Sequence, residues 1–183
     1  MDSILSALWF FLPAGIANMV PVFGSKLPFL KKWNAPMDFG RTYRGHRLFG
    51  ANKSWRGLVI GAAAATAVIA LQKYLFTRNL FILEHSWIDY RPASIWLLGP
   101  LFAVGALVAD AVESFFKRQR GIAPGKSWFP FDQIDYIIGG IIFSLPIAIL
   151  SFGTYIWVLA AWFGMHLVFS YIGYLIGVKE HRI

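Results

Sequence analysis

The chain has 183 residues, of which 57% are hydrophobic and 17% aromatic, and this apolar share indicates a membrane protein rather than an ordinary soluble domain. Only 14% of the residues are charged and none is cysteine, which leaves no room for a separate soluble module and excludes disulfides, thiolate metal sites and a cysteine nucleophile. The net charge of +8 comes from cations in segments between apolar runs, where they usually set membrane orientation, so we expect no nucleic-acid partner.

Five apolar runs follow one another along the chain, each close to the ~20 residues that a helix needs to cross a bilayer. They cover about residues 4–23, 58–76, 93–109, 136–152 and 155–178. We therefore predict an all-α integral membrane protein with five transmembrane helices that form a single membrane domain over residues 1–183. The first run is interrupted by Pro13, Asn18 and Pro21.

The cations predict how these spans are oriented, because Lys and Arg accumulate in the cytoplasmic loops. All of the 17 Lys and Arg residues except Lys73, Arg78 and Arg91 fall on one side of a five-span arrangement. The cations on this cytoplasmic side include Lys26, Lys31, Lys179 and Arg182. The N-terminus is thus expected outside and the C-terminus in the cytoplasm, with a long cytoplasmic loop after the first span. We expect a multi-pass protein of the cell membrane, in contact with the lipid bilayer.

Small residues recur at spacings that let helix backbones approach closely. They are Gly57 and Gly61, the run from Ala62 to Ala65, and Gly173 and Gly177. This pattern predicts tight packing within the bundle, and a homodimer is the other arrangement that it fits.

Charged residues cluster where the third and fourth spans approach the cytoplasm, in "ADAVESFFKRQRG" (109–121) and "FDQIDYIIGG" (131–140). Asp110, Glu113, Ser114 and Lys117 have helical spacing and share one face. Asp132 and Asp135 share a face of the next helix. Three or four carboxylates would then meet at the membrane border, where isolated charge is costly. Mg²⁺ prefers such oxygen ligands, whereas zinc would call for Cys or clustered His.

Acidic ligands for a metal beside cations for phosphate are the requirements of phosphoryl or nucleotidyl transfer. We expect the site to face the cytoplasm and to be formed by loops at about 25–56 and 117–131. A structural alternative stays open at this point: the acids and bases could simply pair along helices, and the loop cations could only set topology.

The same segments, together with "PMDFGRTYRGHRLFGANKSWRG" (36–57), resemble the CDP-archaeol synthase family, relatives of CDP-diacylglycerol synthase. The resemblance covers most of the chain and includes motif order and spacing. It implies a Mg²⁺-dependent transfer of CMP from CTP to an isoprenoid ether lipid phosphate, 2,3-di-O-geranylgeranylglyceryl phosphate, giving CDP-archaeol and pyrophosphate. The partners implied are CTP and a membrane lipid phosphate.

The resemblance also implies roles for individual residues. Asp110, Lys117, Asp132 and Asp135 are expected to be catalytic, and Asp110, Asp132 and Asp135 to hold the metal. The substrate-binding residues expected from the family pattern are Asp38, Arg44, Arg47, Lys53, Arg56, Ser114, Arg118 and Gln133. The chain departs from the pattern at Ala109, where the family has glycine, and at Ala51 and Asn52, which replace an acidic-glycine pair.

Three other functions remain as alternatives. The same reaction on phosphatidate would give CDP-diacylglycerol, but the His-Gly-Gly that precedes the closing acidic run in those enzymes is absent from "KSWFPFDQID". A CDP-alcohol phosphotransferase would need an Asp-Gly-x-x-Ala-Arg signature, which is also absent. A non-catalytic transporter or scaffold is the alternative from another class. Transporter sites usually lie near the bilayer midplane on interrupted, repeated helices, and no repeat is visible here.

Overall fold

The structure is a computed structural model that describes residues 2–24, 30, 32–50, 52–124 and 126–175. Some residues used in the predictions above lie outside this part of the chain. They are Lys26, Lys31, Lys179 and Arg182 from the orientation argument, Ala51 from the loop motif, and Gly177 from the small-residue pattern.

Within the described residues, four helices are long and apolar enough to cross a bilayer. They are α1 (Asp2–Gly24), α3 (Trp55–Phe76), α5 (Leu98–Gln119) with the short 3-10 helix η1 (Ala93–Leu97) before it, and α7 (Phe152–Leu175). The described residues also form two shorter helices, α4 (Leu80–His85) and α6 (Phe131–Ser144). The mostly helical membrane architecture is thus confirmed, whereas five full spans are not.

Helix α6 differs most from its prediction. The fourth span was expected over 136–152, but α6 begins at Phe131 and ends at Ser144. Its 14 residues extend only ~21 Å along the helix axis. Pro146 explains the early end, because proline cannot donate a backbone hydrogen bond and disfavours helical geometry in the residue before it. Residues 147–150 are apolar but not helical.

Helix α5 also differs, in the opposite direction. Its apolar run ends near residue 109, yet the helix continues to Gln119. This extension carries Asp110, Glu113 and Lys117 on helical backbone, as their spacing predicted.

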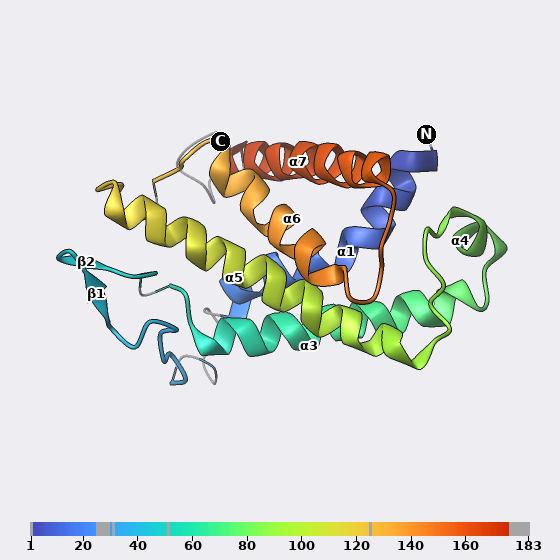
Figure 1. Ribbon diagram of the computed structural model, residues 1–183, viewed down its shortest axis with the longest axis horizontal. Coiled ribbons are helices and arrows are strands. Elements are labelled where there is room, and N and C mark those ends of the chain that lie inside the picture. The colour runs from blue at the N-terminus through green and yellow to red at the C-terminus, as the bar shows by residue number, and fades with distance from the viewer. Residues whose placement is uncertain (1, 25–29, 31, 51, 125, 176–183) are drawn as a thin grey trace.

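The loop between α1 and α3 contains a small antiparallel hairpin, which the all-α prediction did not include. Strand β1 (Thr42–Tyr43) pairs with β2 (His46–Arg47). Both turn residues have positive φ, 51° at Arg44 and 80° at Gly45, as the tight turns that match strand twist require. Figure 1 shows this hairpin at one end of the molecule, next to the C-terminal end of α5, with α4 at the opposite end.

Aromatic side chains form the centre of the bundle. Phe10 and Phe11 of α1 meet Phe102 of α5 edge to face, with ring centroids 5.4 and 5.3 Å apart. Trp162 of α7 packs on Phe11 and donates from its indole nitrogen to the Ala7 carbonyl oxygen at 3.2 Å. Helix α1 is therefore held against both α5 and α7, while α6 lies between α5 and α7 (Figure 1).

The prolines inside α1 leave carbonyl groups free for other helices. Pro13 has no N–H to donate to the carbonyl of Trp9, four residues earlier. That oxygen instead accepts from the fully buried side-chain amide of Gln72 on α3, at 2.5 Å. The proline that seemed to weaken the first span thus allows a hydrogen bond between helices.

Candidate active site

Two glycines set the distance between α5 and α6. A Cβ on Gly139 would lie 2.2 Å from the carbonyl oxygen of Gly105 and 2.4 Å from the Cβ of Ala109. No side chain fits in that space, so the backbones touch. Asp135 lies one turn before Gly139, and Asp110 follows Ala109 directly. The close crossing therefore brings carboxylates from two helices together.

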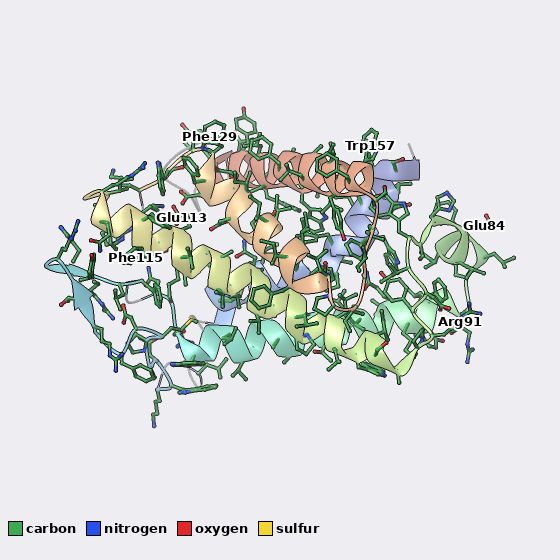
Figure 2. The ribbon with its side chains drawn as sticks, in the orientation of Figure 1. Glu84, Arg91, Glu113, Phe115, Phe129 and Trp157 are labelled. Carbon is green, nitrogen blue, oxygen red and sulfur yellow. The ribbon has the colours of Figure 1, made fainter. Side chains whose placement is uncertain are left out.

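Three carboxylates converge beside this crossing. Asp110 and Glu113 from α5 and Asp135 from α6 each offer an oxygen, and these oxygens all lie within 4.8 Å of one another. Figure 2 shows Glu113 on the part of α5 nearest the hairpin. Among the described residues, the buried Oε1 atom of Glu113 has no hydrogen-bond partner.

These residues fit a hard divalent cation. Carboxylate oxygens are the ligands that Mg²⁺ takes, and its bonds of 2.0–2.1 Å place neighbouring ligands about 3–4 Å apart. The spacing found here is slightly wider, and side-chain rotation can close it. The Oε1 atom of Glu113 accepts no hydrogen bond within the described residues, and its nearest cation, the Lys117 ammonium, lies 3.8 Å away. A closer donor or cation would stabilise this buried carboxylate.

Two lysines neutralise the carboxylates in this structure. Lys53, at the end of the long loop, bonds Oδ2 of Asp110 through its Nζ at 2.5 Å. Lys117 bonds Oδ1 of Asp132 at 2.7 Å and lies 3.8 Å from Glu113. The other oxygen of Asp132 accepts from the backbone N–H of Trp128 at 2.6 Å. Asp132 is thus engaged with Lys117 and the backbone. Glu113 joins Asp110 and Asp135 in the carboxylate cluster, where the family pattern had placed Asp132.

Asp38 and Arg47 have positions that organise the loop. Asp38 accepts from the Arg47 guanidinium at 2.7 Å and from the backbone N–H groups of Gly40, Phe49 and Gly50. Burial alone would raise the pKa of the Asp38 carboxyl, but these four donors outweigh it and lower the pKa to about 2. The side chain is fully enclosed. Asp38 therefore holds the loop in shape, and it has no free oxygen directed at a ligand.

The remaining predicted residues divide into two groups. Arg56, Ser114 and Gln133 are buried, on α3, α5 and α6 respectively. Several of their polar atoms, like those of Arg118, find no partner within the described part of the chain. These atoms are Nε of Arg56, Nη1 of Arg118 and Oε1 of Gln133. Arg44, in contrast, lies exposed at the hairpin turn, with its guanidinium over the Tyr43 ring.

A cavity of about 650 Å³ with a mixed lining opens beside Lys53 and Asp110, and its volume is within the usual range for small-molecule sites. We call it the polar cavity, after the charged and amide side chains in its wall. Helices α1, α3 and α5 and the long loop all contribute to its wall. The lining residues include Asn18, Asn34, Asn52, Lys53, Ser54, Arg56 and Asp110. The cavity thus offers amide groups, two cations and one carboxylate of the cluster.

Sequence reasoning placed Glu113 on the same helix face as Asp110 but did not include it among the expected metal ligands. The signal was its i, i+3 spacing from Asp110. It also missed the three asparagines of the cavity, because Asn34 and Asn52 lie in the loop and Asn18 was seen only as an interruption of the first span.

Comparisons with known proteins identify the family of the chain. A family model described as CarS-like, CDP-archaeol synthase, matches residues 1–182. The CDP-archaeol synthase of Thermococcus onnurineus is 35% identical over 181 residues, which cover 98% of this chain and 97% of that protein. The CDP-archaeol synthase of Methanococcus aeolicus is 30% identical over 179 residues, covering 97% and 95%.

A solved structure gives the same result for the fold. It is described as an intramembrane enzyme for archaeal membrane lipids biosynthesis, and it is similar to this chain with a TM-score of 0.70 and 29% identity. The match covers 90% of this chain and 92% of that chain. Because the family match extends over nearly the whole sequence, the chain belongs to the CDP-archaeol synthase family of lipid cytidylyltransferases.

Proposed function

We propose that the chain transfers CMP from CTP to 2,3-di-O-geranylgeranylglyceryl phosphate, forming CDP-archaeol and pyrophosphate. One observation carries the proposal: the carboxylates of Asp110, Glu113 and Asp135 converge next to Lys53 and Lys117, at the wall of a polar cavity. Acids for a metal and cations for phosphates stand together there, as nucleotidyl transfer requires.

The reaction needs no nucleophile from the protein. An oxygen of the lipid phosphate attacks the α-phosphorus of CTP and forms a new P–O bond. The bond from that phosphorus to the β-phosphate oxygen breaks, and pyrophosphate leaves with the electron pair. The protein's task is to align the two phosphates and to neutralise their charge.

We assign Mg²⁺ to Asp110, Glu113 and Asp135. When bound there, the cation supplies charge neutralisation at the reacting phosphate oxygens. Asp132 has a different role in this proposal: it holds the Lys117 ammonium in place through the 2.7 Å ion pair. This differs from the assignment made from the family pattern, in which Asp132 was a metal ligand.

The cations of the cavity are proposed to bind the CTP phosphates. Lys53 and Arg56 both line the cavity, and Arg56 keeps one buried N–H unused within the described residues. Unused buried donors favour an anionic ligand, because they gain a strong charge-assisted hydrogen bond when it arrives. Arg118, with its buried and unused Nη1 atom, is the matching candidate from α5.

We further propose that the end of the molecule that bears the hairpin faces the cytoplasm. The cation distribution supports this orientation, and it gives CTP access to the polar cavity. In the same proposal the protein lies in the cell membrane as one domain.

The test is an assay of purified protein with CTP and a panel of lipid phosphates, with the CDP-lipid detected by mass spectrometry. We expect product with the geranylgeranyl ether lipid phosphate, loss of product with EDTA, and recovery with Mg²⁺. Product from phosphatidate alone would contradict the substrate assignment but keep the reaction type. No product from any lipid phosphate would refute the function.

One variant tests the carboxylate cluster. Asp135→Asn removes a ligand and should lower turnover by ~10³-fold, since residues that position metal and phosphates carry most of this catalysis. The matched control is Glu84→Gln, the same change of carboxylate to amide on α4 at the opposite end of the molecule (Figure 2). Full turnover by Asp135→Asn would overturn the metal assignment.

A further inference from the structure

A second, mostly apolar cavity of about 430 Å³ lies between α1, α6 and α7. Its lining includes Gly15 and Met19 of α1, Tyr136 of α6, and Trp162 and Phe169 of α7. Gly15 allows the close packing of Trp162, because a Cβ there would overlap the indole ring. The groove is suited to hydrocarbon chains that enter from the bilayer.

The two cavities share one wall. Asn18 and Val22, one turn apart on α1, line both the polar cavity and the apolar groove. The carboxylate cluster borders the polar cavity through Asp110, and Tyr136, on the same helix as Asp135, lines the groove. A lipid whose tail occupies the groove must therefore pass Asn18 to bring its headgroup to the carboxylates.

Asn18 is an unusual residue at such a place. It lies within a candidate membrane span, three residues before Pro21. Its side chain is half-buried, and within the part of the chain that the structure describes it has no hydrogen-bond partner. A polar side chain inside a span is costly unless a partner satisfies it, and for that reason it usually marks a functional position.

We propose that Asn18 binds the phosphate of the lipid substrate and positions it at the junction of the two cavities. The side-chain amide has two N–H donors for phosphate oxygens, and Val22 completes the apolar side of the passage. Asn18 is thus a positioning and specificity residue that distinguishes a lipid phosphate from the corresponding lipid alcohol. This inference rests on the proposed function for the identity of the substrate.

The test compares Asn18→Leu, which keeps the size of the side chain but removes its polar atoms, with Asn18→Gln, which keeps the amide. Val20→Leu is the matched control, because Val20 lies on the same helix and lines neither cavity. Because a hydrogen bond to a charged group is lost, Asn18→Leu should raise KM for the lipid phosphate by at least ~10-fold. KM for CTP should stay within about twofold, and Asn18→Gln should recover part of the loss.

A binding measurement without CTP gives a second readout. Thermal stabilisation in detergent is measured with 2,3-di-O-geranylgeranylglyceryl phosphate and with the lipid alcohol that lacks the phosphate. The parent chain and Val20→Leu should be stabilised more by the phosphate than by the alcohol, and Asn18→Leu should lose this difference.

Two results would overturn the inference: unchanged lipid KM and lipid stabilisation in Asn18→Leu, or a loss confined to CTP binding. If Asn18→Leu does not fold, the kinetics of Asn18→Gln provide the test. An unchanged KM for the lipid phosphate together with a raised KM for CTP in Asn18→Gln would also contradict the inference. Failure of the proposed function would give a different result. Neither the parent chain nor any variant would form a CDP-lipid, while binding of the lipid phosphate would still depend on Asn18.

Discussion

The glycine contact between α5 and α6 allows a sharp test of how the carboxylates are positioned. Gly139→Ala would place a Cβ 2.2 Å from the Gly105 carbonyl oxygen and 2.4 Å from the Ala109 Cβ, whereas real Cβ contacts stay above 3.0 Å. The first of these neighbours is backbone and cannot rotate away. The helices must therefore separate by ~1 Å, and such overpacking costs about 1–3 kcal/mol of stability.

The effect on catalysis should exceed the effect on stability. Asp135 on α6 and Asp110 on α5 lie within one turn of the contact, so separating the helices by ~1 Å separates the two carboxylates by a similar amount. A misplacement of ~1 Å costs on the order of 10²-fold in rate. We therefore expect Gly139→Ala to fold but to form CDP-lipid ~10²-fold more slowly, and to need more Mg²⁺ for half-maximal rate.

Two companion variants isolate the cause. Gly164→Ala in α7 adds the same methyl group where nothing lies within 4 Å, so it should keep full activity. Ala109→Gly in the Gly139→Ala background removes one of the two clashes and should restore part of the rate. A Gly139→Ala protein with unchanged rate and unchanged Mg²⁺ dependence would refute the idea that this contact sets the carboxylate spacing.

Three further predictions follow from other contacts. Lys53→Met should lower kcat/KM at least ~10²-fold, because it removes both the partner of Asp110 and a cation for phosphate. The control is Arg78→Gln, which removes a positive charge near α4, and an equal loss of kcat/KM in this control would contradict the prediction. The pKa of the Asp38 carboxyl falls from 3.8 to about 2 on folding, so this group should contribute about 2 kcal/mol of stability above pH 4, and the contribution should be lost as the pH falls toward 2. The free energies of unfolding of the parent chain and of Asp38→Asn should therefore converge between pH 4 and pH 2, and a constant difference would refute this. Gln72→Leu should lower stability by about 1–3 kcal/mol by leaving the Trp9 carbonyl oxygen without its donor; lipid KM should not change, and unchanged thermal unfolding would show that this hydrogen bond contributes nothing.

Hydropathy was sufficient to predict the long spans, because the bilayer requires a minimum length of apolar helix. It failed for α6, where the apolar run continues past Pro146 although the helix ends at Ser144. For the third span, hydropathy marked only the apolar run to about residue 109, and the helical spacing of Asp110, Glu113 and Lys117 predicted that the helix continues beyond it. Hydropathy reports which residues avoid water, and helix ends depend on backbone hydrogen bonding.

The candidate site could be predicted to the level of its helix faces. Spacing put Asp110, Glu113 and Lys117 on one face of α5, and this placement agrees with the structure. Spacing could not choose between Glu113 and Asp132 as the third member of the cluster. That choice depends on the Lys117–Asp132 ion pair and on the depth at which α6 crosses α5, both of which are three-dimensional relations.

The ion pair between Lys53 and Asp110 has a thermodynamic consequence for ligand binding. A divalent cation at Asp110 competes with the lysine ammonium, so metal binding alone is an exchange of one counterion for another and gains little free energy. The phosphates of CTP would offer the displaced lysine a new partner. Metal and nucleotide should therefore each raise the affinity of the site for the other, by the same factor in both directions.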